Sequence, residues 1–122
     1  MREVAIPRVG HLSNAPDEMF QHERIARGPG MAETKITALK RGAQSSAFSL
    51  PEKAALRFTD DVVADVPAGD AGFAAAAQFL SPRQRVERNL TVGYCMLTCR
   101  LLESFAVTIE PEGVTQGRKL KR

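Results

Sequence analysis

The sequence predicts an all-α fold, a compact bundle of about five to six helices in one domain. Apolar residues recur at spacings of three and four through most of the 122 residues, which is the helical period. Two segments, starting at Ser49 and Ser81, carry the capping-box pattern that opens a helix. Only the β-branched stretch at 107–111 looks extended, and one such stretch does not make a sheet.

Composition places the chain among globular proteins. It is 43% hydrophobic and 25% charged, and no window is as apolar and long as a membrane span. The charged N-terminus has no apolar core of the kind that a signal peptide needs. Cys95 and Cys99 are too close for a disulfide framework, which fits a reducing compartment. We therefore expect a cytoplasmic protein that does not associate with a membrane.

The net charge of +3 comes from the C-terminal end. Arg118, Lys119, Lys121 and Arg122 are four of the 17 basic residues, which leaves 13 bases against 14 acids, a charge of −1, in the preceding body. A basic end after Gly113 and Gly117 is typical of a solvated tail. We expect a folded domain over 1–112, a disordered tail over 113–122, and no nucleic-acid partner.

The bounds of the first two helices are predicted from residues that start or interrupt a helix. Proline in a helix interior costs about 3 kcal/mol, so the first helix should start near Ile6 with Pro7 at its first position. Glu3 would then lie on an extended lead-in. The second helix should start after Asn14 as its N-cap and end at Gly28.

Four later helices are predicted from capping residues and from helix-breaking proline and glycine. A short helix is expected within 31–40, and another from Ser49 or Leu50 to the break at Pro67. Asp70 is the expected cap of an alanine-rich helix over 72–80. Ser81 should cap the longest helix, to about residue 107.

This last helix should be the spine of the fold. Its apolar stripe is made of Val86, Leu90, Gly93, Leu97, Leu101 and Phe105. An interior glycine costs about 1 kcal/mol against alanine, so Gly93 predicts a close helix crossing.

One carboxylate and one imidazole carry the functional prediction. Glu18 and His22 lie one turn apart on the second helix, and His22 shares an apolar stripe with Ala15, Met19 and Ala26. A carboxylate beside an imidazole raises its pKa and fixes its tautomer, as suits a proton donor near neutral pH. A buried structural ion pair would give the same pattern, so that interpretation stays open.

Several segments together resemble one family. They are 2–12, 17–26, 30–39, 49–63 and 81–111, which read REVAIPRVGHL, DEMFQHERIA, GMAETKITAL, SLPEKAALRFTDDVV and SPRQRVERNLTVGYCMLTCRLLESFAVTIEP. In this order they resemble the carboxymuconolactone decarboxylase-like family, whose helical fold is shared with alkylhydroperoxidase D. Family members usually carry a further N-terminal helical segment, whereas this chain starts at the family's Arg-Glu motif.

The resemblance implies roles for three residues. The glutamate of the Arg-Glu motif falls on Glu3, and the family's Glu-x-x-x-His falls on Glu18 and His22. In the peroxidase branch this helix carries Cys-x-x-Cys-x-x-x-His, which would place the thiols at Ala15 and Glu18. Neither residue is a cysteine, so the resemblance favours the decarboxylase branch.

The first hypothesis is a cofactor-free lyase that decarboxylates a carboxylated lactone or another small anionic acid. His22 would be the catalytic acid, Glu18 its orienting carboxylate and Glu3 a second proton shuttle. Arg8 or Arg24 could hold the anionic substrate. No cofactor and no metal are expected, because the two histidines and two cysteines match no metal-site spacing.

Two alternatives remain. A peroxidase-like redox protein would have to use Cys95 or Cys99, although cysteines at this spacing on a long helix are typical of core packing. A degenerate, non-catalytic oligomeric module would fit Pro7 within the Arg-Glu element and the missing upstream segment. In any of the three cases the resemblance implies a homo-oligomer, a trimer or a hexamer.

Overall fold

The chain folds as a bundle of helices, which confirms the all-α expectation. The computed structural model describes residues 2–28, 30–65 and 67–107, apart from the side chains of residues 2, 3, 17 and 18. Within these residues there are six α-helices, one 3₁₀ turn and no strand. The basic tail over 113–122 and most of the stretch at 107–111 lie outside the described residues, so both expectations stay untested.

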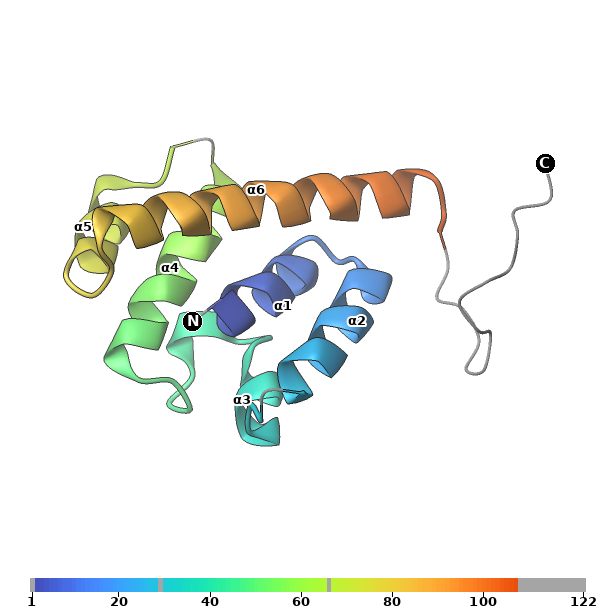
Figure 1. Ribbon diagram of the computed structural model, residues 1–122, viewed down its shortest axis with the longest axis horizontal. Helices are drawn as coiled ribbons and strands as arrows, with labels where there is room; N and C mark the ends of the chain where they lie inside the picture. Colours follow the sequence, from blue (N-terminus) through green and yellow to red (C-terminus); the bar gives the residue numbers. More distant parts are fainter. Residues whose placement is uncertain (1, 29, 66, 108–122) are drawn as a thin grey trace.

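The helices follow one another with short connections. Their bounds are α1 Arg2–Leu12, α2 Pro16–Arg27, α3 Glu33–Ala38, η1 Gly42–Gln44, α4 Leu50–Ala64, α5 Asp70–Ala77 and α6 Pro82–Ser104. The long α6 runs along one edge of the molecule, with α1, α2 and α4 on the same side of it (Figure 1). Helix α1 packs against α2, α4 and α6, so it is the centre of the bundle.

Both predicted capping boxes are present. Ser49 precedes α4, and its backbone N–H donates to the carboxylate of Glu52 over 2.8 Å. Ser81 precedes α6, where its hydroxyl accepts from the N–H of Gln84 and its own N–H donates to the Gln84 side chain. These contacts satisfy amide groups that have no partner inside the helix, which is why local sequence is enough to place both starts.

The predicted start of the first helix was wrong. Helix α1 begins at Arg2 and contains Pro7 in its interior, so Glu3 belongs to the helix and not to an extended lead-in. Pro7 is fully buried. Packing of its ring in the bundle therefore offsets the hydrogen bond that a proline cannot donate.

Two other predicted caps were also wrong. The N-cap of α2 is Ala15, and Asn14 lies in the turn before it with a φ of 50°, a left-handed conformation that asparagine tolerates. The N-cap of α5 is Gly69, so Asp70 is the first helical residue. There its carboxylate is placed in the first turn, where negative charge is favourable.

The core consists of two clusters, and each contains residues of α1 and α4. The larger lies against α6 and contains Val9, Ala15, Phe58, Val62, Ala76, Leu80, Val92, Cys95 and Cys99. The smaller lies near α3 and contains Val4, Ala38, Leu39, Ala43, Phe48 and Leu56. The predicted stripe of α6 belongs to neither cluster. The buried face of α6 is made instead by Arg88, Val92, Cys95 and Cys99.

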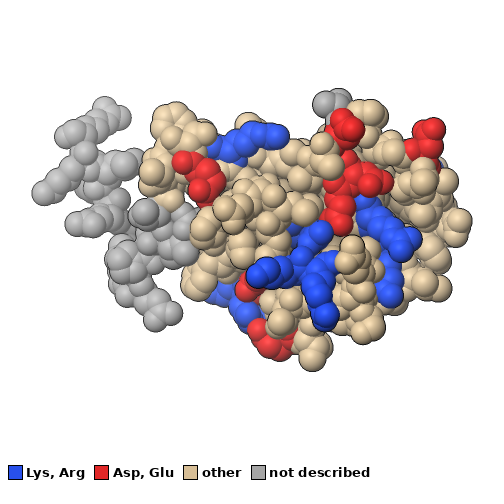
Figure 2. Space-filling view, turned by 180° about the vertical axis from the view of Figure 1, so that it is seen from behind, with Lys and Arg blue, Asp and Glu red and all other residues tan. Residues whose placement is uncertain are grey.

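Charge on the molecular surface is mixed. On the face seen in Figure 2, acidic side chains lie among and around the basic ones. None of the helices in the described part of the chain combines the length and apolar character needed to span a bilayer.

Candidate functional site

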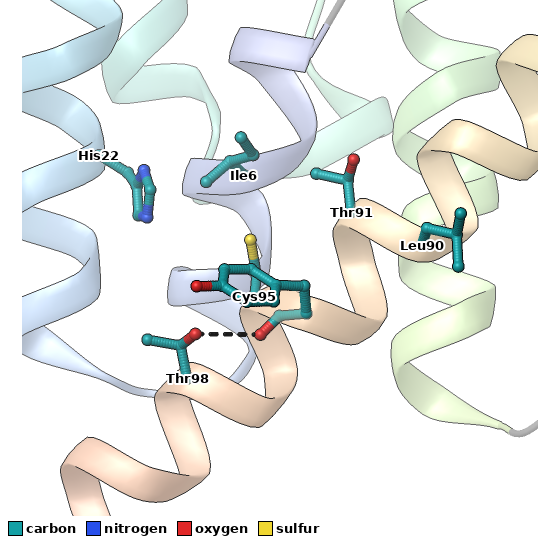
Figure 3. A pocket seen from close by; sticks show the side chains of 7 residues that line it. Ile6, His22, Leu90, Thr91, Cys95 and Thr98 are labelled. Atoms are coloured by element: carbon teal, nitrogen blue, oxygen red, sulfur yellow. Dashed lines mark hydrogen bonds between the residues drawn. The ribbon is translucent and has the colours of Figure 1, made fainter.

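A pocket of about 590 Å³ lies between α2 and α6, with α1 behind it. Its walls are formed by Ile6 of α1, His22 of α2, and Leu90, Thr91, Tyr94, Cys95 and Thr98 of α6. Figure 3 shows the imidazole of His22 and the thiol of Cys95 directed into the space that these helices enclose. The pocket therefore places one titratable side chain of α2 opposite a row of small polar groups on α6.

His22 reaches the pocket because α2 buries the predicted stripe. Ala15 and Ala26 are buried, and His22 and Met19 are half-buried on the same side of the helix. Small alanines at both ends let α2 approach its neighbours, whereas the larger His22 and Met19 reach into the space between the helices. His22 therefore lies on the side of α2 that faces the other helices, and its predicted catalytic role stays a prediction.

Cys95, for which the sequence favoured core packing over a redox role, is a residue of the pocket wall. Cys95 is 6% exposed and belongs to the core, yet it also borders the pocket. Cys99, one turn later, is 2% exposed and borders a separate pocket of about 370 Å³ beside Leu12, Met96 and Arg100. Both cysteines are therefore inward residues of α6. No local motif predicts that Cys95 shares a pocket with His22, because the two residues lie on different helices that each pack against α1.

The hydroxyl groups of the pocket differ in what they offer to a ligand. Thr91 donates its hydroxyl to the carbonyl of Glu87 over 2.8 Å, and Thr98 donates to the carbonyl of Tyr94 over 3.0 Å. Each threonine therefore presents acceptor lone pairs to the pocket. The Tyr94 side chain is largely exposed and can turn its hydroxyl to the opening as a donor. Ile6 and Leu90 supply apolar walls.

Two of the three predicted catalytic side chains are not among the described ones. The structure places the backbone of Glu3 in the first turn of α1 and that of Glu18 in α2, one turn before His22. Their side chains lie outside the described residues, so the convergence of Glu3, Glu18 and His22 stays a prediction. Close packing of α1 against α2 and α6 brings the three helices into one region.

Neither predicted anion anchor lies in this pocket. Arg8 is buried, and its guanidinium donates to Asp60 of α4 and to the carbonyls of Leu39 and Lys40. It therefore ties α1 to α4 and to the segment after α3. Arg24 is exposed on α2 and is not a wall of the pocket. Among the described residues that line the pocket, His22 is the one that can carry positive charge.

The described residues contain another imidazole beside a carboxylate. Nε2 of His11 lies 3.2 Å from Oε1 of Glu23, across the contact of α1 with α2. Burial lowers the pKa of His11 below its ordinary value of 6.5, and Arg8 and Lys40 lower it further, against the opposing effect of Glu23. His11 lines neither pocket described above, so this pair is a structural contact.

Among the side chains that the structure describes, which exclude those of Glu3, Asp17 and Glu18, no three of His, Cys, Asp or Glu come together in a way that could hold a metal ion. The pocket instead offers an imidazole, a thiol, hydroxyl groups and apolar walls, which suit the binding of a small organic molecule and a proton transfer.

Comparison with known proteins supports the fold. No family model matches the chain, and no curated protein sequence matches it. A crystal structure from Agrobacterium tumefaciens, of a protein of unknown function described as a candidate antioxidant defence protein AhpD, matches with a TM-score of 0.85. The two are 19% identical, and the match covers 91% of this chain and 77% of the other. The chain thus has the AhpD-like, all-helical fold that its resemblance to alkylhydroperoxidase D implied.

Proposed function

We propose that the protein is a cofactor-free lyase that removes CO₂ from a small carboxylated lactone or a related organic acid. The observation that carries the proposal is the imidazole of His22, directed into a pocket of about 590 Å³ with apolar and neutral polar walls. This volume suits a small organic acid. The absence of cysteine at Ala15 and Glu18, where the resembling peroxidases have their thiols, also favours acid–base chemistry.

The reaction needs a proton donor and a place for a transient negative charge. The bond between the carboxylate carbon and the ring breaks, CO₂ leaves, and the electron pair passes into an enolate. His22 then gives its proton to the ring carbon and regains one from water. The apolar side chains of Ile6 and Leu90 favour loss of a charged carboxylate as neutral CO₂, because burial of charge is costly.

The two glutamates have supporting roles in this proposal. Glu18, one turn before His22 on α2, is the proposed carboxylate that orients the imidazole. Glu3, in the first turn of α1, carries the replacement proton from solvent. The Tyr94 hydroxyl donates a hydrogen bond to the substrate or the enolate.

Turnover of a carboxylated unsaturated γ-lactone, followed by CO₂ release, tests the proposal. Replacing His22 with Gln should lower the rate by about 10²- to 10⁴-fold, because a positioned proton donor contributes that much. His11→Gln is the matched control, since His11 lines neither pocket and should leave the rate unchanged. Equal rates for wild type and His22→Gln would remove His22 from the chemistry. No turnover of any carboxylated lactone by the wild-type protein would overturn the lyase assignment.

A second candidate is thiol-dependent reduction of a peroxide. The observation that favours it is Cys95, which shares the pocket with His22. The Cys95 thiolate would attack the peroxide oxygen, the O–O bond would break, and an alcohol and a cysteine sulfenate would form. An external thiol would then reduce the sulfenate, because Cys99 borders a different pocket. Burial of Cys95 disfavours this candidate, since the peroxide must reach the sulfur.

Consumption of hydrogen peroxide and of tert-butyl hydroperoxide in the presence of dithiothreitol separates the two candidates. Thiol chemistry requires turnover that Cys95→Ser abolishes and Cys99→Ser retains. The lyase proposal expects no thiol-dependent turnover by the wild-type protein, together with slow modification of both thiols by Ellman's reagent until the protein is unfolded.

A further inference from the structure

Helix α6 has two apolar faces, and one of them is uncovered. Val92, Cys95 and Cys99 face the core, whereas six large apolar side chains face outward. This outer stripe consists of Val86, Leu90, Tyr94, Leu97, Leu101 and Phe105, which are between 55% and 74% exposed. The exposed fractions place this stripe on the surface of α6 that faces away from the buried Val92, Cys95 and Cys99. A continuous apolar stripe of this kind is typical of an interaction surface.

The size of the outer stripe matches that of a protein interface. Six large apolar side chains at these exposures present on the order of 700 Å². A stable interface of standard size buries about 800 Å² on each partner. The stripe alone therefore approaches the area that a specific dimer needs.

The stripe is also complementary to itself. Gly93 lies near its midpoint, and no atom lies within 4 Å of the position that a Cβ would occupy there. A second helix can approach closely at such a residue. A two-fold axis beside Gly93 would bring Leu90 of one copy to Leu97 of the other. The same axis would pair Val86 with Leu101, so an antiparallel contact would cover apolar groups on both copies at once.

We propose that α6 pairs in an antiparallel manner with α6 of a second copy of this chain, with the crossing point at Gly93. A second copy is favoured over an unrelated partner because the stripe matches itself under a two-fold rotation. The Gly93 crossing predicted from the sequence is then a contact between copies. Pairing of this kind agrees with an assembly of two copies or with a hexamer of three pairs, but not with an isolated trimer.

The pairing also completes the His22 pocket. Leu90 and Tyr94 belong both to the outer stripe and to the pocket wall. The α6 helix of the second copy therefore lies across the edge of the opening and shields it from water. The pairing rests on exposure and symmetry and does not depend on the proposed lyase chemistry.

Sedimentation equilibrium of the full chain from 1 to 100 μM tests the pairing. The wild-type protein should form an even-numbered oligomer. Leu97→Glu combined with Leu101→Glu should weaken association by about 100-fold or more, because it buries charge at the contact. Neither leucine lines the pocket around His22. Ile25→Glu is the matched control on α2, where Ile25 is 59% exposed, and should leave association unchanged. Helical circular dichroism and cooperative thermal unfolding must be retained by each variant.

A cross-link at the crossing point provides an independent test. Gly93→Cys should form a disulfide-linked dimer under mild oxidation with diamide, because residues beside a two-fold axis lie within disulfide reach. Arg57→Cys, exposed on α4, and the wild-type protein should remain uncross-linked. A monomeric wild-type protein at 100 μM, or an oligomer that neither the glutamate pair nor Gly93→Cys affects, would overturn the pairing. Loss of lyase activity with intact pairing would contradict only the proposed function.

Discussion

Arg8 of α1 holds both carboxylate oxygens of Asp60 of α4. Its Nε lies 2.7 Å from Oδ1 and its Nη2 lies 3.0 Å from Oδ2, and these residues are 52 positions apart in the sequence. The remaining nitrogen, Nη1, donates to the carbonyls of Leu39 and Lys40, each over 2.8 Å. One guanidinium thus joins three segments of the chain, which explains why Arg8 is buried and unavailable to a substrate.

Replacement of Arg8 with Met should lower the free energy of unfolding by about 3 kcal/mol, because Asp60 and two carbonyl groups lose their partner. Urea denaturation monitored by circular dichroism measures the change. The free energy of unfolding of Arg8→Lys should lie between those of Arg8→Met and the wild type, since an ammonium keeps the charge but cannot bind both carboxylate oxygens of Asp60 at once. Equal stability of all three proteins would show that the pair does not join α1 to α4 energetically.

Gly42→Ala should also destabilise the protein. Gly42 has a φ of 59°, and a Cβ there would lie 2.7 Å from Cζ of Arg8. The guanidinium is held by four hydrogen bonds and cannot move aside freely. We expect a loss of about 2 kcal/mol in urea denaturation. In the Arg8→Met background the loss should be smaller, because the contact is gone and only the backbone strain remains.

Stability should fall in mild acid because of His11. Burial and the cations Arg8 and Lys40 keep the pKa of His11 below 6.5 in the folded protein. As the pH falls below about 6.5, the unfolded chain takes up a proton on His11 that the folded protein refuses, so the free energy of unfolding decreases. Urea denaturation between pH 5 and pH 8 should show this slope, and His11→Gln should reduce it.

The Glu23 variant provides a check on the sign of this effect. Glu23 raises the pKa of His11, against the effect of burial. Glu23→Gln should therefore lower that pKa further and extend the loss of stability to lower pH. A slope that is the same in the wild type, His11→Gln and Glu23→Gln would assign the pH dependence to other groups.

Removal of either capping serine should destabilise its helix. Ser81→Ala and Ser49→Ala each remove a side chain from a capping box, and each should cost about 1 kcal/mol. Thermal unfolding followed by calorimetry measures the loss. Ser46→Ala, at an exposed turn position outside both boxes, is the matched control and should change stability by less than about 0.5 kcal/mol.

The helix starts that could be predicted depend on neighbouring residues. A capping box is complete within four residues, so Ser49 and Ser81 reveal α4 and α6 without any tertiary information. Pro7 is the opposite case. The hydrogen bond that α1 loses at Pro7 can be foreseen from the sequence, whereas the stabilising burial of its ring among other helices cannot. Intrinsic preference is a weak guide wherever packing contributes more.

The face of α6 that enters the core could not be predicted for a related reason. Val92, Cys95 and Cys99 are small, and they are buried, whereas the larger Leu90, Leu97 and Phe105 are exposed. Periodicity finds an apolar face but does not say what covers it. The candidate site likewise has one part that the sequence predicts and one part that depends on tertiary packing. The inward position of His22 could be predicted from the residue pattern of α2, but its neighbours on α6 depend on how the helices pack together.

Leu90 and Tyr94 serve two surfaces at once, and this has an evolutionary consequence. A substitution at either position that changes the shape of the pocket also changes the outer stripe of α6. With the proposed ligand site and the proposed pairing of α6, substrate preference and quaternary structure should therefore change together across descendants of this gene.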